Sequence, residues 1–81
     1  MSANAAAQNS RKFYAVTPSN SVNLPGAPLG LYVGGAGDVA LVGADDAVVT
    51  FTAVPAGSVL PCGPKRVNAT NTTATSIVAL Y

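Results

Sequence analysis

Residue types that usually perform catalysis or bind metals are scarce in this 81-residue chain. Histidine, glutamate and tryptophan are absent, and the acidic side chains are Asp38, Asp45 and Asp46. A chain without histidine cannot use a serine–histidine or cysteine–histidine pair, and one without glutamate has few carboxylates for general acid and base catalysis. The composition therefore predicts a protein that is not an enzyme.

The three aspartates and one cysteine are the remaining candidates for chemistry. Asp38, Asp45 and Asp46 would give a calcium ion three oxygen ligands and leave several positions to backbone and water, which makes a weak site. Cys62 is followed closely by two cations, which favour a thiolate. No general base or second cysteine accompanies it, so we expect Cys62 to be a small apolar side chain. We expect no metal site and no cofactor.

Residues 35–40 (GAGDVA) fit the glycine fingerprint of dinucleotide-binding sites. In such sites the glycines precede a helix whose N-terminus holds the phosphates. Here the residues that follow, 39–42, are typical of a strand. We therefore interpret the glycines as part of a β-hairpin turn.

Tyr14, Tyr32 and Tyr81 are candidates for stacking against sugars. Sugar-binding platforms also need convergent polar groups, and these tyrosines lie within apolar stretches. Packing in a core or an interface is the favoured interpretation, and a carbohydrate- or receptor-binding β module remains the alternative.

Charged residues make up 9% of the chain and the net charge is +1. This charge is too weak to attract nucleic acid or an anionic membrane surface. No stretch approaches the roughly 20 apolar residues of a transmembrane helix, and residues 1–12 lack the apolar core of a signal peptide, which predicts synthesis in the cytoplasm. The basic pairs Arg11–Lys12 and Lys65–Arg66 are either solvated or paired with aspartates of an adjacent subunit.

From residue 13 onward, glycine and proline interrupt short apolar runs at intervals of about eight to twelve residues, which is typical of all-β folds. The pattern predicts a small antiparallel β-sandwich or barrel over residues 13–81, preceded by an extended N-terminal arm over residues 1–12. The expected strands cover residues 12–17, 29–33, 39–42, 47–54, 59–60 with 66–69, and 76–81. Residues 29–54 should form an antiparallel meander.

Side-chain alternation predicts the faces of two strands. In the strand at residues 47–54, Val49, Phe51 and Ala53 point to one side, so we expect this side to face the core and Phe51 to be buried. The strand at residues 76–81 is apolar on both sides, which indicates a core on one side and another subunit on the other. The other interpretation is a central strand covered by the chain's own arm. The expected oligomer interface consists of Ile77, Val78, Ala79, Leu80 and Tyr81.

A domain of this size needs support beyond its own core. Alanine, which buries little area, is the commonest apolar residue, and the single Cys62 excludes an internal disulfide. Small domains otherwise rely on disulfides, metals or oligomerisation. Homo-oligomerisation is therefore the predicted source of additional stability.

Three spaced segments carry a family resemblance: LYVGGAGDVAL at residues 31–41, VTFTAVPAGSVLP at 49–61 and RVNATNTTATSIVALY at 66–81. Together they resemble the small spike-base and head-decoration proteins of tailed bacteriophages and gene transfer agents. The chain differs from that pattern at Asn71, where glycine is commoner, and at residues 62–65.

The resemblance implies a β-rich structural protein on the capsid surface of a virion assembled in the host cytoplasm, with no catalytic residues. It further implies a pentamer at a fivefold vertex, with a trimer as the alternative, bound to the major capsid protein and to a spike fibre protein. We expect the N-terminal arm to lie along a neighbouring surface, with Arg11 and Lys12 contacting acidic groups of the capsid.

Overall fold

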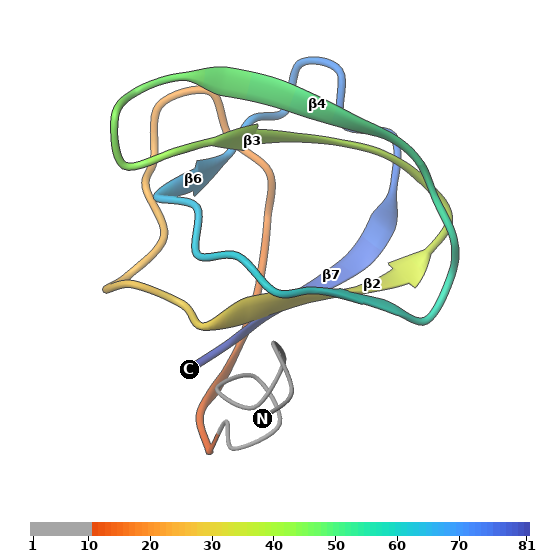
Figure 1. Cartoon of the computed structure of the whole chain (residues 1–81), viewed down its shortest axis with the longest axis horizontal. Helices are drawn as coiled ribbons and strands as arrows, with labels where there is room; N and C mark the ends of the chain where they lie inside the picture. Colours follow the sequence, from red (N-terminus) through yellow and green to blue (C-terminus); the bar gives the residue numbers. More distant parts are fainter. Residues whose placement is uncertain (1–10) are drawn as a thin grey trace.

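The computed structural model describes residues 11–81, which form seven β-strands and no helix (Figure 1). The all-β, antiparallel fold predicted from the turn spacing is confirmed. No helix in this part of the chain is long and apolar enough to span a membrane. The strands are β1 (Phe13–Ala15), β2 (Gly30–Gly35), β3 (Gly37–Val42), β4 (Val48–Val54), β5 (Ser58–Leu60), β6 (Arg66–Val67) and β7 (Thr75–Leu80).

The strands form two antiparallel sheets that face each other. One has the order β1-β7-β2-β5 and the other β4-β3-β6. Only Ala36 separates β2 from β3, so the chain passes from one sheet to the other almost without interruption. The predicted meander over residues 29–54 is therefore wrong in part: β3 and β4 pair as a hairpin, but β2 pairs with β5 and β7 instead of β3.

The two sheets share one apolar core, to which five strands and the segment before β7 contribute. Side-chain alternation directs Leu31 and Val33 of β2 inward, where both are fully buried. The complete buried cluster is Leu31, Val33, Val39, Leu41, Val54, Val67, Ala74, Ile77 and Ala79.

Glycines at the junction of β2 and β3 allow close contact between backbones. A Cβ atom at Gly34 would lie 2.8 Å from Cβ of Ser76, and one at Gly37 would lie 2.6 Å from the backbone nitrogen of Ala74. Gly34 adopts no positive φ angle. The hairpin interpretation is therefore corrected: these glycines make room for the segment leading into β7.

A β-bulge in β4 changes which of its side chains face the core. Val39 pairs with Phe51, but Gly37 pairs with Val54, so β4 has one extra residue at this point. The bulge includes Ala53, whose φ angle is 54°. Val54 is buried and Ala53 is exposed, so the predicted inward orientation of Ala53 is wrong.

The prediction that Phe51 is buried is also wrong. Phe51 pairs with Val39 and Val49 pairs with Leu41, which places both β4 side chains on the core-facing side of the sheet. The opposite sheet does not cover them there, and Phe51 and Val49 are 39% and 56% exposed.

The polar segment after β6 completes the pairing of β3. The Ala40 N–H donates to Thr72 Oγ1 and the Asp38 N–H donates to Thr73 Oγ1, both at 2.9 Å. The Thr73 N–H donates back to the Asp38 carbonyl. These threonine hydroxyls take the place of strand carbonyls, which gives this segment a structural role.

Candidate functional site

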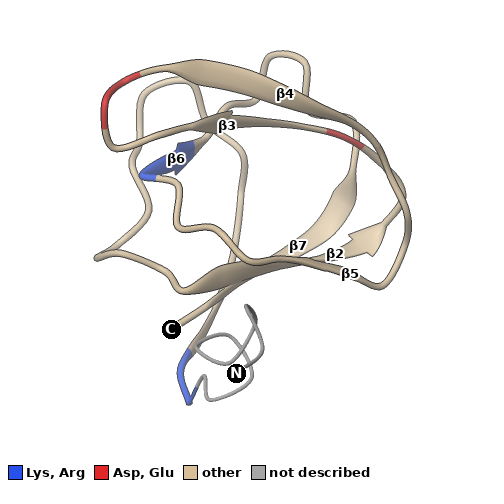
Figure 2. Cartoon of the chain, viewed as in Figure 1, with Lys and Arg blue, Asp and Glu red and all other residues tan. Residues whose placement is uncertain are grey.

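The aspartates are divided between two ends of β3 and do not form a metal site (Figure 2). Asp38 Oδ1 accepts a hydrogen bond from Ala53 N–H at 2.9 Å, which holds the β4 bulge. Asp46 forms an ion pair with Lys65 of the same chain. Within residues 11–81, no three histidine, cysteine or acidic side chains are grouped closely enough to bind a metal ion.

The second basic pair is engaged within its own chain. Besides the Lys65–Asp46 ion pair, the Arg66 Nε–H donates to Asn68 Oδ1 at 2.9 Å and Arg66 Nη1–H donates to Asn23 Oδ1 at 3.3 Å. Within the chain, Lys65 and Arg66 therefore already have partners, whereas the sequence left open either solvated charges or pairing with aspartates of an adjacent subunit.

Cys62 lies half-buried in the loop after β5, and burial raises the pKa of its thiol. Desolvation penalises the charged form and outweighs any effect of the neighbouring cations, in agreement with the interpretation of Cys62 as a small apolar side chain. At neutral pH the side chain is a neutral thiol, and it packs against the core cluster.

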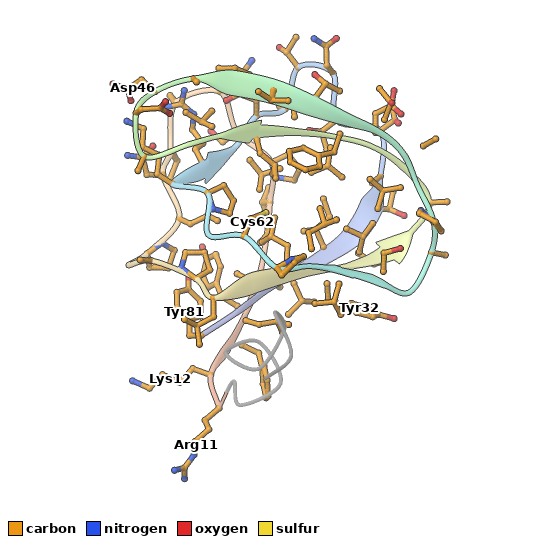
Figure 3. All side chains as sticks on the ribbon, in the orientation of Figure 1. Arg11, Lys12, Tyr32, Asp46, Cys62 and Tyr81 are labelled. Carbon is orange, nitrogen blue, oxygen red and sulfur yellow. The ribbon has the colours of Figure 1, made fainter. Side chains whose placement is uncertain are left out.

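An open cavity of about 280 Å³ lies between the core-facing side of β4 and the loop after β5. Cys62 lies on this loop (Figure 3). Its walls are almost entirely apolar, with Asp45 as the one charged residue among them. The lining residues are Leu41, Gly43, Asp45, Ala47, Val49, Phe51, Cys62, Gly63 and Pro64. No residue of the four-stranded sheet belongs to this lining, which comes from β3, β4, the turn between them and the loop after β5.

The five residues of the predicted oligomer interface have different environments. Ile77 and Ala79 are buried in the chain's own core, with 3% and 0% exposure. Val78 and Leu80 point to the opposite side of β7 and are half-buried. Tyr81 donates its hydroxyl proton to the carbonyl of Pro25 at 2.5 Å. Of these five, Val78 and Leu80 are therefore the side chains directed away from the core.

Val78 and Leu80 belong to a larger apolar surface that crosses all four strands of their sheet. In the strand register, Val78 lies between Ala15 and Tyr32, Val59 follows Tyr32, and Leu80 lies beside Phe13. Phe13 is 70% exposed. We call this surface the outer face; it comprises Phe13, Ala15, Tyr32, Val59, Val78 and Leu80, and none of these residues is charged.

The outer face was only partly predicted from the sequence. Val78 and Leu80 belong to the predicted oligomer interface, and the sequence favours core or interface packing for Tyr32, whereas it predicts no contact for Phe13 and Val59. The alternation of Tyr32 with the buried Leu31 and Val33 was the available signal.

The three tyrosines do not form one sugar-binding platform. Tyr14 pairs with Ala79 and Tyr32 pairs with Val78, so the two tyrosines lie on opposite sides of the sheet. Burial raises the pKa of Tyr81, and the negative charge of a nearby ionised Tyr14 raises it further.

Arg11 and Lys12 extend the pairing of β1 with the end of β7. The Arg11 N–H donates to the Tyr81 carbonyl at 2.9 Å, and the Tyr81 N–H donates to the Lys12 carbonyl at 2.8 Å. Both side chains are exposed and point in different directions (Figure 3). The remainder of the predicted arm, residues 1–10, lies outside the described residues.

Comparison with known proteins finds a similarity among solved structures. No family model matches the chain, and no curated protein matches it. Among solved structures, the chain is similar to a chain in the capsid of a native GTA (gene transfer agent) particle computed with C5 symmetry. The two are 38% identical with a TM-score of 0.81, and the match covers 89% of this chain and 83% of the other.

Proposed function

This chain belongs to the same family as a gene transfer agent capsid protein, and we propose that it decorates the particle head as the base of a vertex spike. Family membership makes it a structural component of a phage-like particle. The proposal adds its position on the capsid surface, its self-association and its attachment to a fibre protein.

The observation that carries the proposal is the outer face. It presents six uncharged residues across four strands, including Phe13, Tyr32 and Val59, which are all at least 39% exposed. Contiguous exposed apolar surfaces of this kind mark protein interaction sites. We therefore propose that Val78 and Leu80, at the centre of this face, contact another copy of the chain.

We propose five copies around a fivefold axis, with three as the alternative. The C5 symmetry of the related capsid structure supports five copies. Cyclic symmetry is common among homo-oligomers, and burial of the outer face would stabilise a domain with a small core.

We propose that Arg11 and Lys12 attach the ring to the major capsid protein. They lie at the opposite end of the molecule from Asp45 and Asp46 (Figure 2), and this separation gives the end that carries them a local positive charge. A positively charged end favours contact with acidic groups on a partner. The particle would be assembled in the host cytoplasm, with the spike base on the capsid surface.

Native mass spectrometry of the purified chain tests self-association. We expect a closed oligomer at micromolar concentration, which Val78→Lys and Val59→Lys each dissociate, because both place a charge in the outer face. Val22→Lys is the matched control, since Val22 is 69% exposed but lies outside this face. Circular dichroism confirms that each variant remains folded. A wild-type chain that stays monomeric would overturn the proposal.

Capsid attachment is tested separately, by adding purified chain to particles that lack it and measuring occupancy by cryo-electron microscopy. We expect Lys12→Ala combined with Arg11→Ala to reduce occupancy. Lys65→Ala, which removes a cation at the other end of the molecule, should not. Equal occupancy by all variants would exclude this role for Arg11 and Lys12.

A further inference from the structure

A ring of more than two copies needs two different contact surfaces on each chain, because its contacts are head-to-tail. The outer face supplies one surface. We infer that the cavity beneath β4 supplies the other, and that it receives Phe13 of the next copy. This inference rests on the proposed self-association and identifies the second of the two surfaces that form the contact.

The cavity has the properties of an acceptor site. Val49 and Phe51 are directed toward the core but are left exposed over an opening of about 280 Å³. Above them, β4 forms the edge of its sheet and, within residues 11–81, pairs with β3 alone. Edge strands are usually protected by charged residues or proline, and the sequence of β4, VVTFTAV, contains neither. Both the strand edge and the cavity therefore require a cover.

Phe13 has the properties of the matching side chain. At 70% exposure it is the most exposed large apolar residue of the described chain. A cavity of about 150 Å³ lined by apolar residues is sufficient to bind benzene, so the phenyl ring of Phe13 fits the larger opening beneath β4. Phe13 also lies at the margin of the outer face. When Phe13 enters the cavity of the next copy, the outer face is therefore brought against that copy as well.

The two surfaces lie at opposite ends of the molecule, as a head-to-tail contact requires. The chain after β1 pairs with β6, through the Ser19 N–H bond to the Val67 carbonyl and the Leu24 N–H bond to the Lys65 carbonyl. This places β1 at the β6 end of the other sheet. In contrast, β5 follows β4 after a short turn, which places β4 at the other end.

Charge complementarity identifies the occupant as another copy of this chain. Asp45 is the one charged residue in the cavity lining. The adjacent residue, Asp46, forms an ion pair with Lys65 of its own chain. Arg11 precedes Phe13 by two residues, which an extended chain spans in about 7 Å. With Phe13 in the cavity, the Arg11 guanidinium can therefore reach Asp45 of the next copy. This contact assigns Arg11 to the ring, so that of the two cations proposed above to contact the capsid only Lys12 keeps that role.

Cross-linking to the native Cys62 tests this contact. In a Phe13→Cys variant, mild oxidation with copper phenanthroline should join the introduced thiol to Cys62 of the neighbouring chain. The reaction is run at about pH 9, because burial raises the pKa of Cys62 and the thiolate is the reactive form. We expect a ladder of covalent oligomers up to the full ring, with the joined peptides identified by mass spectrometry.

Two controls define the result. Val22→Cys introduces an equally exposed thiol elsewhere and should give no ladder with Cys62. Combining Phe13→Cys with Cys62→Ala should also abolish the ladder. Cross-links that join two introduced thiols and stop at dimers would overturn the inference, because they indicate a symmetric contact.

A measurement without an introduced cysteine completes the test. In the assembled wild-type ring, Cys62 should be protected from reaction with a maleimide. Phe13→Ala should remove this protection. It should also raise the dissociation constant of the ring about thirtyfold, which is the effect of removing a buried aromatic hot spot. If the wild-type chain does not assemble, the proposed function fails. If it assembles while Cys62 stays reactive and no ladder forms, only the present inference fails.

Discussion

Replacing Asp38 with alanine should destabilise the fold far more than an ordinary surface substitution. The Asp38 carboxylate accepts the Ala53 N–H at 2.9 Å and thereby holds the bulge that turns Val54 into the core. The backbone bonds from Asp38 to Thr73 do not depend on its side chain. The substitution therefore removes one defined interaction and leaves the Ala53 N–H without its acceptor.

The expected loss follows from that one bond. A hydrogen bond to a charged group contributes about 1.5–3 kcal/mol. A domain of this length has a total stability of about 4–12 kcal/mol, at roughly 0.05–0.15 kcal/mol per residue. Asp38→Ala should thus remove a large fraction of the stability. With a slope of about 1 kcal/mol per molar urea for a small domain, the unfolding midpoint should fall by about 1.5–3 M.

Urea unfolding followed by circular dichroism measures the effect, at one protein concentration for all variants because assembly contributes to stability. Asp38→Asn keeps an oxygen acceptor and should lose about half as much, since its hydrogen bond is neutral. Asp45→Ala is the matched control: Asp45 also accepts a backbone N–H, that of Ala47, at 3.2 Å, and both bonds are exposed, but the Asp45 bond lies within a turn and holds no bulge. If Asp38→Ala and Asp45→Ala lose equal stability, the bulge does not depend on the Asp38 side chain.

Three further predictions concern single positions. Gly37→Ala should cost more than Gly57→Ala. Both glycines have a positive φ angle, 156° and 81°, which strains an alanine at either position, but a Cβ at Gly37 would in addition lie 2.6 Å from the Ala74 nitrogen, whereas Gly57 has open space. Overpacking costs about 1–3 kcal/mol, so equal unfolding midpoints would contradict this reasoning. Asn71 has a φ angle of 68°, so Asn71→Gly should be tolerated and Asn71→Val should lose about 1–2 kcal/mol in the same urea assay. The pKa of Tyr81 is raised in the folded chain, so as pH rises the unfolded chain loses the phenol proton at a lower pH than the folded chain does. The free energy of unfolding should therefore fall as pH rises above about 10. Urea unfolding measured across this pH range should show a weaker pH dependence for Tyr81→Phe.

The fold class could be predicted because its signals are local. The spacing of glycine and proline indicated an all-β chain, and alternation correctly directed Val49 and Phe51 toward the core. Whether an inward side chain is buried depends on the other sheet, and alternation carries no information about its extent. Phe51 was therefore assigned the correct side and the wrong exposure.

The errors in topology have a similar physical origin. Gly34 and Gly37 looked like turn residues because glycine is common in hairpins, but their role is to admit the backbone of residues 74–76, which is distant in sequence. The bulge at Ala53 depends on the Asp38 side chain from another strand. Contacts between distant segments cannot be inferred from the local patterns that identify strands.

The distribution of charge explains why the candidate surfaces are apolar. Asp38 is engaged in the bulge, Asp46 in the ion pair with Lys65, and Arg66 in bonds to asparagine side chains. Most of the few charged groups of residues 11–81 therefore stabilise the subunit itself. The outer face and the edge of β4 carry no charge to prevent association. Residues 19–24 of the chain itself cover the edge of β6, whereas no described residue covers the edge of β4. A neighbouring subunit that covers the edge of β4 best accounts for this difference.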